Sequence, residues 1–160
     1  MVFIVQMNQR CHGMLDKYDF VPALRSSDSG EQTDDGENFN KIHIGAERYL
    51  SVTRFKNELR VHIRRHEKTA SGRDYPTKMG VCLPVKRFAR FLDVLSEVTD
   101  RIAAAALDSQ ILEYRRHIGG GIFVTMDPNF KVVNLRLYFR PEGTTKPIPT
   151  RCGVTIKLDN

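Results

Sequence analysis

The sequence predicts an α+β fold, in which a β-unit followed by an amphipathic helix occurs once in full and once without its helix. Leu59, Val61 and Ile63 alternate with polar residues, and a period of two is typical of a half-buried strand. Apolar residues then recur at spacings of three and four over residues 85–107, as they do on one face of a helix. Short motifs of the first unit recur in the same order further along, which indicates an internal repeat.

Apolar residues on either side of Gly45 predict two strands before the one described above. Ile42 and Ile44 precede this glycine, Leu50 and Val52 follow it, and all four have polar neighbours.

The segment between the Leu59 strand and the helix contains a loop and a further strand. Residues 68–76 are small, charged or proline except for Tyr75, and we expect a loop there. The segment 79–83 is short and apolar, as expected of a strand. We expect Cys82 to be a small buried side chain within it. Pro84 is suited to the entry of the helix that follows.

The repeat defines the predicted organisation of the chain. The matching motifs are residues 49–52 with 123–126, 55–56 with 130–131, 59–64 with 135–140, and 76–81 with 149–154. We therefore expect an N-terminal tail over 1–39, a first unit over 40–108 and a second over 113–160. The second unit ends where its helix should begin, so either it is truncated or the helix of the first unit covers it. The glycines at 119–121 are expected to allow a kink or bulge.

Composition excludes several classes of protein. The 160 residues suffice for one domain or two small ones, and no apolar run is long enough for a membrane-spanning helix. The N-terminal residues lack the features of a secretory signal. Three cysteines lie far apart in the sequence, which argues against a disulfide scaffold and favours a reducing compartment.

Charge is distributed unevenly along the chain. The formal net charge is +6, but residues 1–39 hold 3 Lys and Arg against 7 Asp and Glu, so the remainder of the chain is strongly basic. A basic body favours a polyanionic partner. Residues 26–37 contain no apolar side chain, so we expect them to be disordered. They are either a solvated linker or a tail that competes with the polyanion, a competition that phosphorylation of their Ser and Thr would strengthen.

The polar face of each long strand is the main functional clue. Residues on one face of a strand lie about 6.5–7 Å apart, close to the nucleotide spacing of a relaxed single strand. Arginine binds phosphate through two parallel hydrogen bonds, and aromatic side chains stack on bases. The alternative is that these residues are only the solvated face of a sheet. The residues concerned are Arg60, His62 and Arg64 in the first unit, and Arg136, Tyr138 and Arg140 in the second.

The first unit also resembles a known family. Residues 44–56, 61–64 and 76–83, followed by Phe88, are similar to the C-terminal domain of the positive cofactor four transcriptional coactivators. The resemblance covers residues 41–107 well and 114–158 more loosely. It implies a twisted antiparallel sheet followed by a helix, a dimer, and a nuclear protein that binds single-stranded or melted DNA and assists RNA polymerase II transcription. Its other implied partners are the transcription machinery and activators.

The candidate DNA-binding residues follow from the resemblance, the repeat and the basic strand faces. They are Arg54, Phe55, Lys56, Arg60, Arg64, Lys78, Gly80, Phe130, Lys131, Arg136, Tyr138, Arg140 and Arg151.

Several positions depart from the family pattern. Where the family has basic residues, this chain has Ala46, Thr53, Glu58 and Met79, and Glu67 replaces a stacking Trp. Arg54, Arg60 and Arg65 are expected to compensate in part.

Two hypotheses of different classes are therefore open. The first is a non-enzymatic, sequence-tolerant binder of single-stranded DNA, and the second is a dimerising adaptor whose DNA groove has degenerated. The two units could pair within one chain or each with its mate in a second chain. We expect no membrane association and no cofactor. We also expect no catalytic site: residues 117–121 are similar to the oxyanion loop of esterases, but the chain has no Gly-x-Ser-x-Gly nucleophile motif. We also expect no metal site, because His62 and His66 have helical ligand spacing in a predicted strand.

Overall fold

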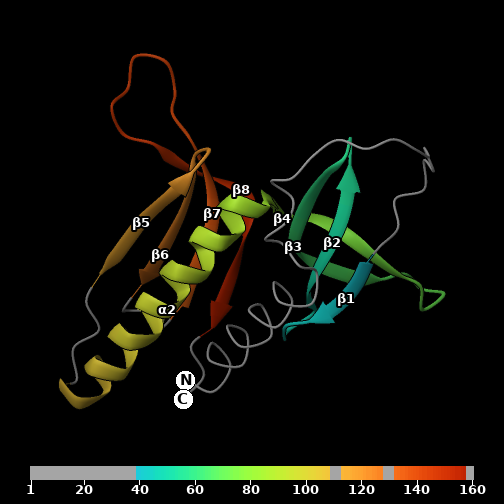
Figure 1. Ribbon diagram of the computed structural model, residues 1–160, viewed down its shortest axis with the longest axis horizontal. Coiled ribbons are helices and arrows are strands. Elements are labelled where there is room, and N and C mark those ends of the chain that lie inside the picture. Colours follow the sequence, from blue (N-terminus) through green and yellow to red (C-terminus); the bar gives the residue numbers. More distant parts are fainter. Residues whose placement is uncertain (1–38, 109–112, 128–131, 158–160) are drawn as a thin grey trace.

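The computed structural model describes residues 39–108, 113–127 and 132–157, which form two four-stranded antiparallel sheets and one helix (Figure 1). The predicted α+β class is confirmed, and within the described residues the second sheet is not followed by a helix. The helix α2 runs along the second sheet, and the two sheets lie next to each other with β4 beside β8.

The first sheet has the order β1-β2-β3-β4, so each strand pairs with its neighbour in sequence. Its strands are β1 Phe39–His43, β2 Arg48–Phe55, β3 Glu58–Lys68 and β4 Asp74–Pro84. The loop predicted over 68–76 is shorter than expected, because β3 and β4 continue to pair as far as Lys68 and Asp74. Cross-strand hydrogen bonding therefore extends through a segment whose composition predicted a loop.

The helix α2 spans Val85–Asp108 and begins immediately after Pro84, as predicted. Its buried face includes Phe88, Phe91, Leu95 and Val98, each with 0% of its surface exposed. No helix in the described parts of the chain has the apolar length that crossing a membrane requires.

The second sheet has the order β5-β6-β7-β8 and the same antiparallel pairing. Its strands are β5 Tyr114–Gly119, β6 Ile122–Asp127, β7 Val132–Phe139 and β8 Ile148–Lys157. The predicted irregularity at 119–121 is confirmed, because the register shifts between His117 and Gly119 and all three glycines have positive φ.

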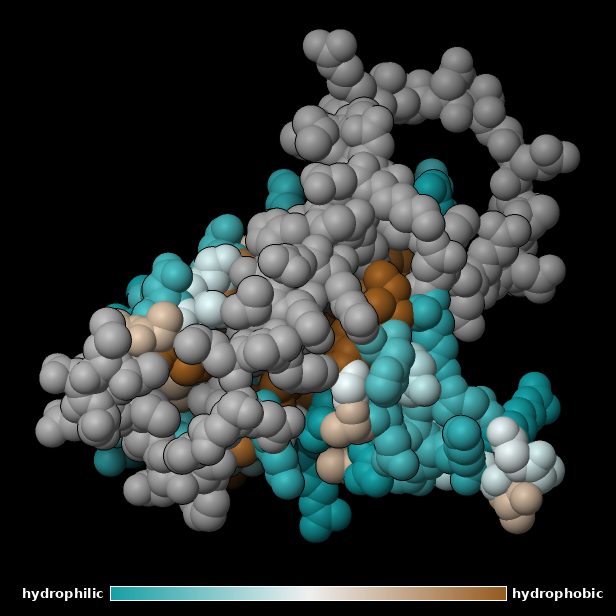
Figure 2. Space-filling model, turned by 90° about the horizontal axis from the view of Figure 1, so that it is seen from below, coloured by the Kyte–Doolittle hydropathy of each residue, from teal (hydrophilic) through white to brown (hydrophobic). Residues whose placement is uncertain are grey.

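Both sheets and the helix share one hydrophobic core. Buried side chains of both sheets form a single cluster with those of α2, which contacts β3, β4, β5 and β6. In the view of Figure 2, the hydrophobic side chains that can be seen gather along the middle of the molecule. Glu97 of α2 ties the helix to the second sheet, since it accepts hydrogen bonds from Tyr114 Oη at 2.8 Å and from Arg116 Nη2 at 3.1 Å. These two bonds hold the pKa of Glu97 below its usual value, the Tyr114 bond contributing most.

Equivalent hydrogen bonds relate the two sheets position by position. His66 N donates to Glu47 O at 2.8 Å, and Tyr138 N donates to Gly121 O at the same distance. Arg64 pairs with Gly80, and Arg136 pairs with Gly153.

One part of the predicted repeat alignment is wrong. The sequence match made Arg140 the equivalent of Arg64 in the second unit. The strand register shows that the equivalent residue is Arg136, four residues earlier. The error arises because the dipeptide Leu-Arg occurs in both strands, at 59–60 and at 135–136. Aligning these two dipeptides shifts the second strand by four residues from the register that the structure shows.

The turn between β1 and β2 holds two side chains in a conformation that favours glycine. Gly45, Ala46 and Glu47 have φ of 93°, 45° and 58°, and the second sheet has glycine at the three equivalent positions, 119–121. An L-residue in this left-handed region costs about 1–2 kcal/mol. The first unit therefore carries strain that the second avoids.

Ala46→Gly is expected to stabilise the protein by about 1 kcal/mol, because strain relief exceeds the added freedom of glycine in the unfolded chain. The midpoint of thermal unfolding should rise by about 2–4 °C. Ala70→Gly is the matched control, since Ala70 is exposed and lacks positive φ. Equal midpoints for the two variants would contradict the strain argument.

Candidate nucleic-acid interface

Each sheet has one face toward the core and an opposite face, which we call the outer face. In β3 the buried Val61 and Ile63 alternate with Arg60, His62 and Arg64, so these three side chains project from the outer face. Among the candidates that the sequence marked, Arg60 and Arg64 lie on this face, and Arg136 and Tyr138 lie on the outer face of the second sheet.

Arg64 is fixed in place on the outer face of the first sheet. Its Nη1 donates to the carbonyl oxygen of Thr77 at 2.6 Å, and no carboxylate among the described residues forms an ion pair with it. Gly80 lies directly opposite, where an added Cβ would stand 2.8 Å from Arg64 Cα. The arginine is thus held by a neutral acceptor and keeps its positive charge available.

Arg136 has the same setting in the second sheet. Its Nη1 donates to the carbonyl oxygen of Thr150 at 2.8 Å, and Gly153 lies opposite with the same close approach. Its Nη2 also donates to Thr155 Oγ1 at 3.3 Å, and that hydroxyl donates to Asn134 Oδ1 at 2.6 Å. Two anchored arginines therefore occupy equivalent positions.

The centre of the first outer face is less basic than the sequence suggested. Arg60 forms an ion pair with Glu58 at 3.0 Å, which offsets its charge. His62 Nε2 lies 2.8 Å from Thr53 Oγ1 and 3.9 Å from Cys82 Sγ. Burial, followed by Arg64 and Arg60, lowers the pKa of His62, so the imidazole is neutral at pH 7. Cys82 is half-buried on this outer face, contrary to its predicted place in the core, because it alternates with the buried Val81 and Leu83.

The β2–β3 turn presents two candidates at the tip of a hairpin. Phe55 is 58% exposed, and the Lys56 ammonium lies 5.6 Å from the centre of its ring. Lys56 and Asn57 both have positive φ, as a two-residue hairpin turn requires. Arg54 is exposed but alternates with the outer-face residues, so it does not share the face of Arg64.

The remaining candidates have varied positions in the two sheets. Lys78 and Arg151 are exposed at equivalent bulges, where β4 and β8 each carry extra residues. Tyr138 is on the second outer face with Arg136, whereas Arg140 is exposed beyond the end of β7. Phe130 and Lys131 lie outside the described residues.

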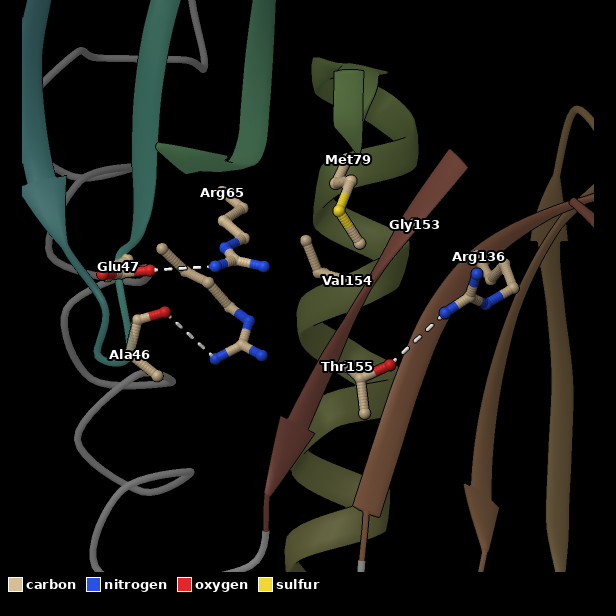
Figure 3. Close-up of a pocket in the computed structure, with 9 residues that line it drawn as sticks. Ala46, Glu47, Arg65, Met79, Arg136, Gly153, Val154 and Thr155 are labelled. Atoms are coloured by element: carbon tan, nitrogen blue, oxygen red, sulfur yellow. Dashed lines mark hydrogen bonds and ion pairs between the residues drawn. The ribbon is translucent and has the colours of Figure 1, made fainter. Parts of the chain in front are cut away.

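A hollow of about 490 Å³ lies where the two sheets meet (Figure 3). Arg48 and Arg65 line it from the first sheet, and Arg136 lines it from the second. Glu47 forms an ion pair with Arg65 at 3.2 Å. A second hollow of about 490 Å³ on the outer face of the second sheet is also lined by Arg136, so the two hollows meet at this arginine.

Two clusters of rings and cations were not predicted from the sequence. Members of each cluster are distant in sequence, and strand pairing brings them together; strict alternation on three neighbouring strands was the only signal that could have found them. We call them the first and second ring clusters. The first consists of Lys41, His43, Tyr49 and His66, and the second of Arg115, His117, Phe123 and Tyr138.

The departures from the family pattern have distinct surroundings. Glu67, at the position where the resemblance leads us to expect a stacking Trp, accepts a hydrogen bond from Tyr75 Oη at 3.0 Å. At the equivalent position of the second sheet, Phe139 is 58% exposed and pairs with Ile148. Met79 is 47% exposed and lines the hollow between the sheets.

His62 and His66, the two histidines with the spacing of helical metal ligands, lie among different side chains. His62 contacts Thr53, whereas His66 Nδ1 lies 3.4 Å from Asp74, so the two histidines have different surroundings. Among the described residues, no three His, Cys, Asp or Glu side chains are grouped to hold a metal ion.

Comparison with known proteins agrees with the resemblance of the first unit. Residues 42–94 match the family model described as Transcriptional Coactivator p15 (PC4). This range covers β2 and β3, β4 and the first part of α2, and it includes Arg64 and Gly80. No solved structure matches the chain at a significant level.

Proposed function

We propose, from the match of residues 42–94 to the family model described as Transcriptional Coactivator p15 (PC4), that this protein binds single-stranded or melted DNA with little sequence preference. In this role it acts as a non-enzymatic coactivator of RNA polymerase II transcription in the nucleus. The family itself supports DNA binding and a coactivator role in general.

The observation that carries the proposal is the pair of anchored arginines. Arg64 and Arg136 each donate to a backbone carbonyl and each lie opposite a glycine, so both guanidinium groups are held on an outer face. A side chain that is already ordered loses little conformational entropy when it binds a phosphate. Because the same anchored arginine occurs once in each sheet, the pair supports a ligand with repeated phosphate groups, such as a nucleic-acid backbone.

The mechanism follows from this geometry. Arg64, Arg136 and the cations at the bulges, Lys78 and Arg151, contact phosphates, while the exposed Phe55 offers a ring to a base. Phosphate contacts carry no sequence information, so affinity varies little with sequence. A protein that binds only the unpaired strand stabilises the open form of a promoter.

Contacts between the two sheets support pairing within one chain. The core is shared, and α2 of the first unit contacts β5 and β6 of the second. We propose that residues 40–108 and 113–160 form an internal pseudo-dimer, in which one helix serves both units. Residues 1–39 carry the net negative charge, and we propose that they act as a competing, phosphorylation-sensitive tail.

A fluorescence-anisotropy titration of a labelled polythymidine strand tests the proposal. Binding is expected, with log Kd rising linearly with log salt at about 0.7 per phosphate contact. Random-sequence single strands should bind about equally, and the matched duplex more weakly. Absence of binding at low salt would overturn the proposal.

The second candidate function is an adaptor that binds protein rather than DNA. Glu58 offsets Arg60, and Glu67 stands where the family has a stacking ring, so the first outer face is weaker as a DNA site than the family pattern predicts. The same titration separates the two candidates, because an adaptor would show no salt-dependent binding of the strand.

A further inference from the structure

The two ring clusters are equivalent members of the repeat. In the first, the Lys41 ammonium lies 3.9 Å from the centre of the Tyr49 ring, which contacts the rings of His43 and His66. In the second, the Arg115 guanidinium lies 4.4 Å from the centre of the Phe123 ring, which contacts His117 and Tyr138. Each cluster thus places a cation over an aromatic ring on an outer face.

The clusters differ in one feature, a carboxylate. Asp74 forms an ion pair with Lys41 and lies 3.4 Å from His66 Nδ1, so the first cluster contains its own anion. The equivalent position in the second unit is two residues before Pro149, just before β8 begins, and is occupied by Pro147. Among the described residues, no carboxylate forms an ion pair with Arg115. The positive charge of the second cluster is therefore not offset in the same way.

The second cluster also holds its cation at an exposed position beside two aromatic rings. Arg115 is exposed and lies over two half-buried rings, at 4.4 Å from Phe123 and 4.9 Å from Tyr138. Its exposed position leaves the guanidinium group accessible from solvent, and such groups stack on nucleobases. The rings beneath hold the guanidinium in place.

The hollow beside this cluster has room and chemistry for a nucleotide. Arg115, Tyr138, Asn134 and Arg136 line its volume of about 490 Å³. Carboxylates of Glu113 and Asp127 also line it. Carboxylates repel free phosphate but accept hydrogen bonds from N–H groups of bases, such as the N3–H of thymine, so the lining favours a nucleotide over inorganic phosphate.

We infer that the second ring cluster is a nucleotide-binding subsite of this protein, in which Arg115 stacks on an unpaired base beside the Arg136 phosphate contact. The equivalent first cluster is blocked by its internal ion pair with Asp74. The two outer faces therefore contribute unequally, and a bound strand is held mainly by the second sheet. This inference rests on the proposed function and specifies where on the protein the strand is recognised.

The test uses the full chain and a polythymidine strand carrying one 2-aminopurine, whose fluorescence falls when the base stacks. Arg115→Ala is expected to weaken binding about 10-fold and to abolish most of the quenching. Arg115→Lys should keep the salt dependence but lose quenching, because an ammonium has no stacking plane. Asp74→Asn should strengthen binding several-fold and steepen the log–log salt dependence by about 0.7, because it releases Lys41.

Lys86→Ala is the matched control, since Lys86 is an exposed cation on α2, away from the outer faces. If Arg115→Ala had the same strand affinity and the same quenching as this control, the inference would be overturned, and the proposed function would still stand. Competition by inorganic phosphate as effective as that by thymidine monophosphate would also overturn it, since only an anion site would remain. Failure of the unmodified protein to bind the strand would instead overturn the proposed function.

Discussion

Replacing Arg64 and Arg136 together by alanine is expected to weaken binding to every single-stranded sequence by about 100-fold at low salt. Each arginine is held by a backbone carbonyl and opposite a glycine, so each offers an ordered, charge-assisted contact to phosphate. Loss of two such contacts at about 1.5 kcal/mol each gives this factor. The log–log salt dependence should become shallower by about 1.4, because two phosphate contacts are lost. Anisotropy titrations at several salt concentrations measure both effects.

Arg140→Ala provides the matched control for this double variant. Arg140 is exposed beyond the end of β7 and lacks the anchored setting of Arg136, so its loss should change affinity only a few-fold. The double variant Arg64→Lys with Arg136→Lys should retain the salt dependence and lose part of the affinity, because charge remains but the planar fork is removed. If the double alanine variant bound the strand as tightly as Arg140→Ala does, the anchored arginines would not be part of the interface. Thermal unfolding of each variant establishes that the fold is intact.

Much of the fold could be predicted because its signals are local. The helix over 85–107 and its entry at Pro84 follow from apolar spacing and proline geometry, and the structure has α2 at Val85–Asp108. The loop predicted over 68–76 is longer than the observed one, because the pairing of β3 with β4 cannot be read from the composition of the segment. The glycines at 119–121 were interpreted correctly because the need for positive φ is local.

The strand register, meaning which residues pair across neighbouring strands, could not be predicted from the sequence. Arg64 and Arg136 correspond only because each lies opposite a glycine across a bulged pair of strands, and a match of letters favoured Arg140 instead. The same limitation hid the ring clusters. Lys41, Tyr49 and His66 come from three strands and meet only when those strands pair in register. Arg54 lies on the face opposite to that of Arg64, which a run of basic residues does not by itself reveal.

Phe91→Ala is expected to destabilise the whole protein by about 3–5 kcal/mol, the usual cost of a cavity left by a buried phenylalanine. Phe91 is fully buried on α2 within the cluster that both sheets share, so neither sheet should keep its stability when the helix loosens. Urea unfolding measures the loss, and amide hydrogen exchange shows where it occurs. Protection of Val61 in the first sheet and of Val124 in the second should fall by the same factor.

Asp100→Ala on the exposed side of the same helix is the control, and its effect should stay within about 0.5 kcal/mol. Two separate unfolding transitions, or loss of protection confined to one sheet, would show that the sheets fold independently and would contradict the internal pseudo-dimer. A single transition would mean that the second sheet depends on a helix that follows the first. The relative placement of Arg64 and Arg136 would then be fixed by the shared core, and a strand could reach both without a second chain.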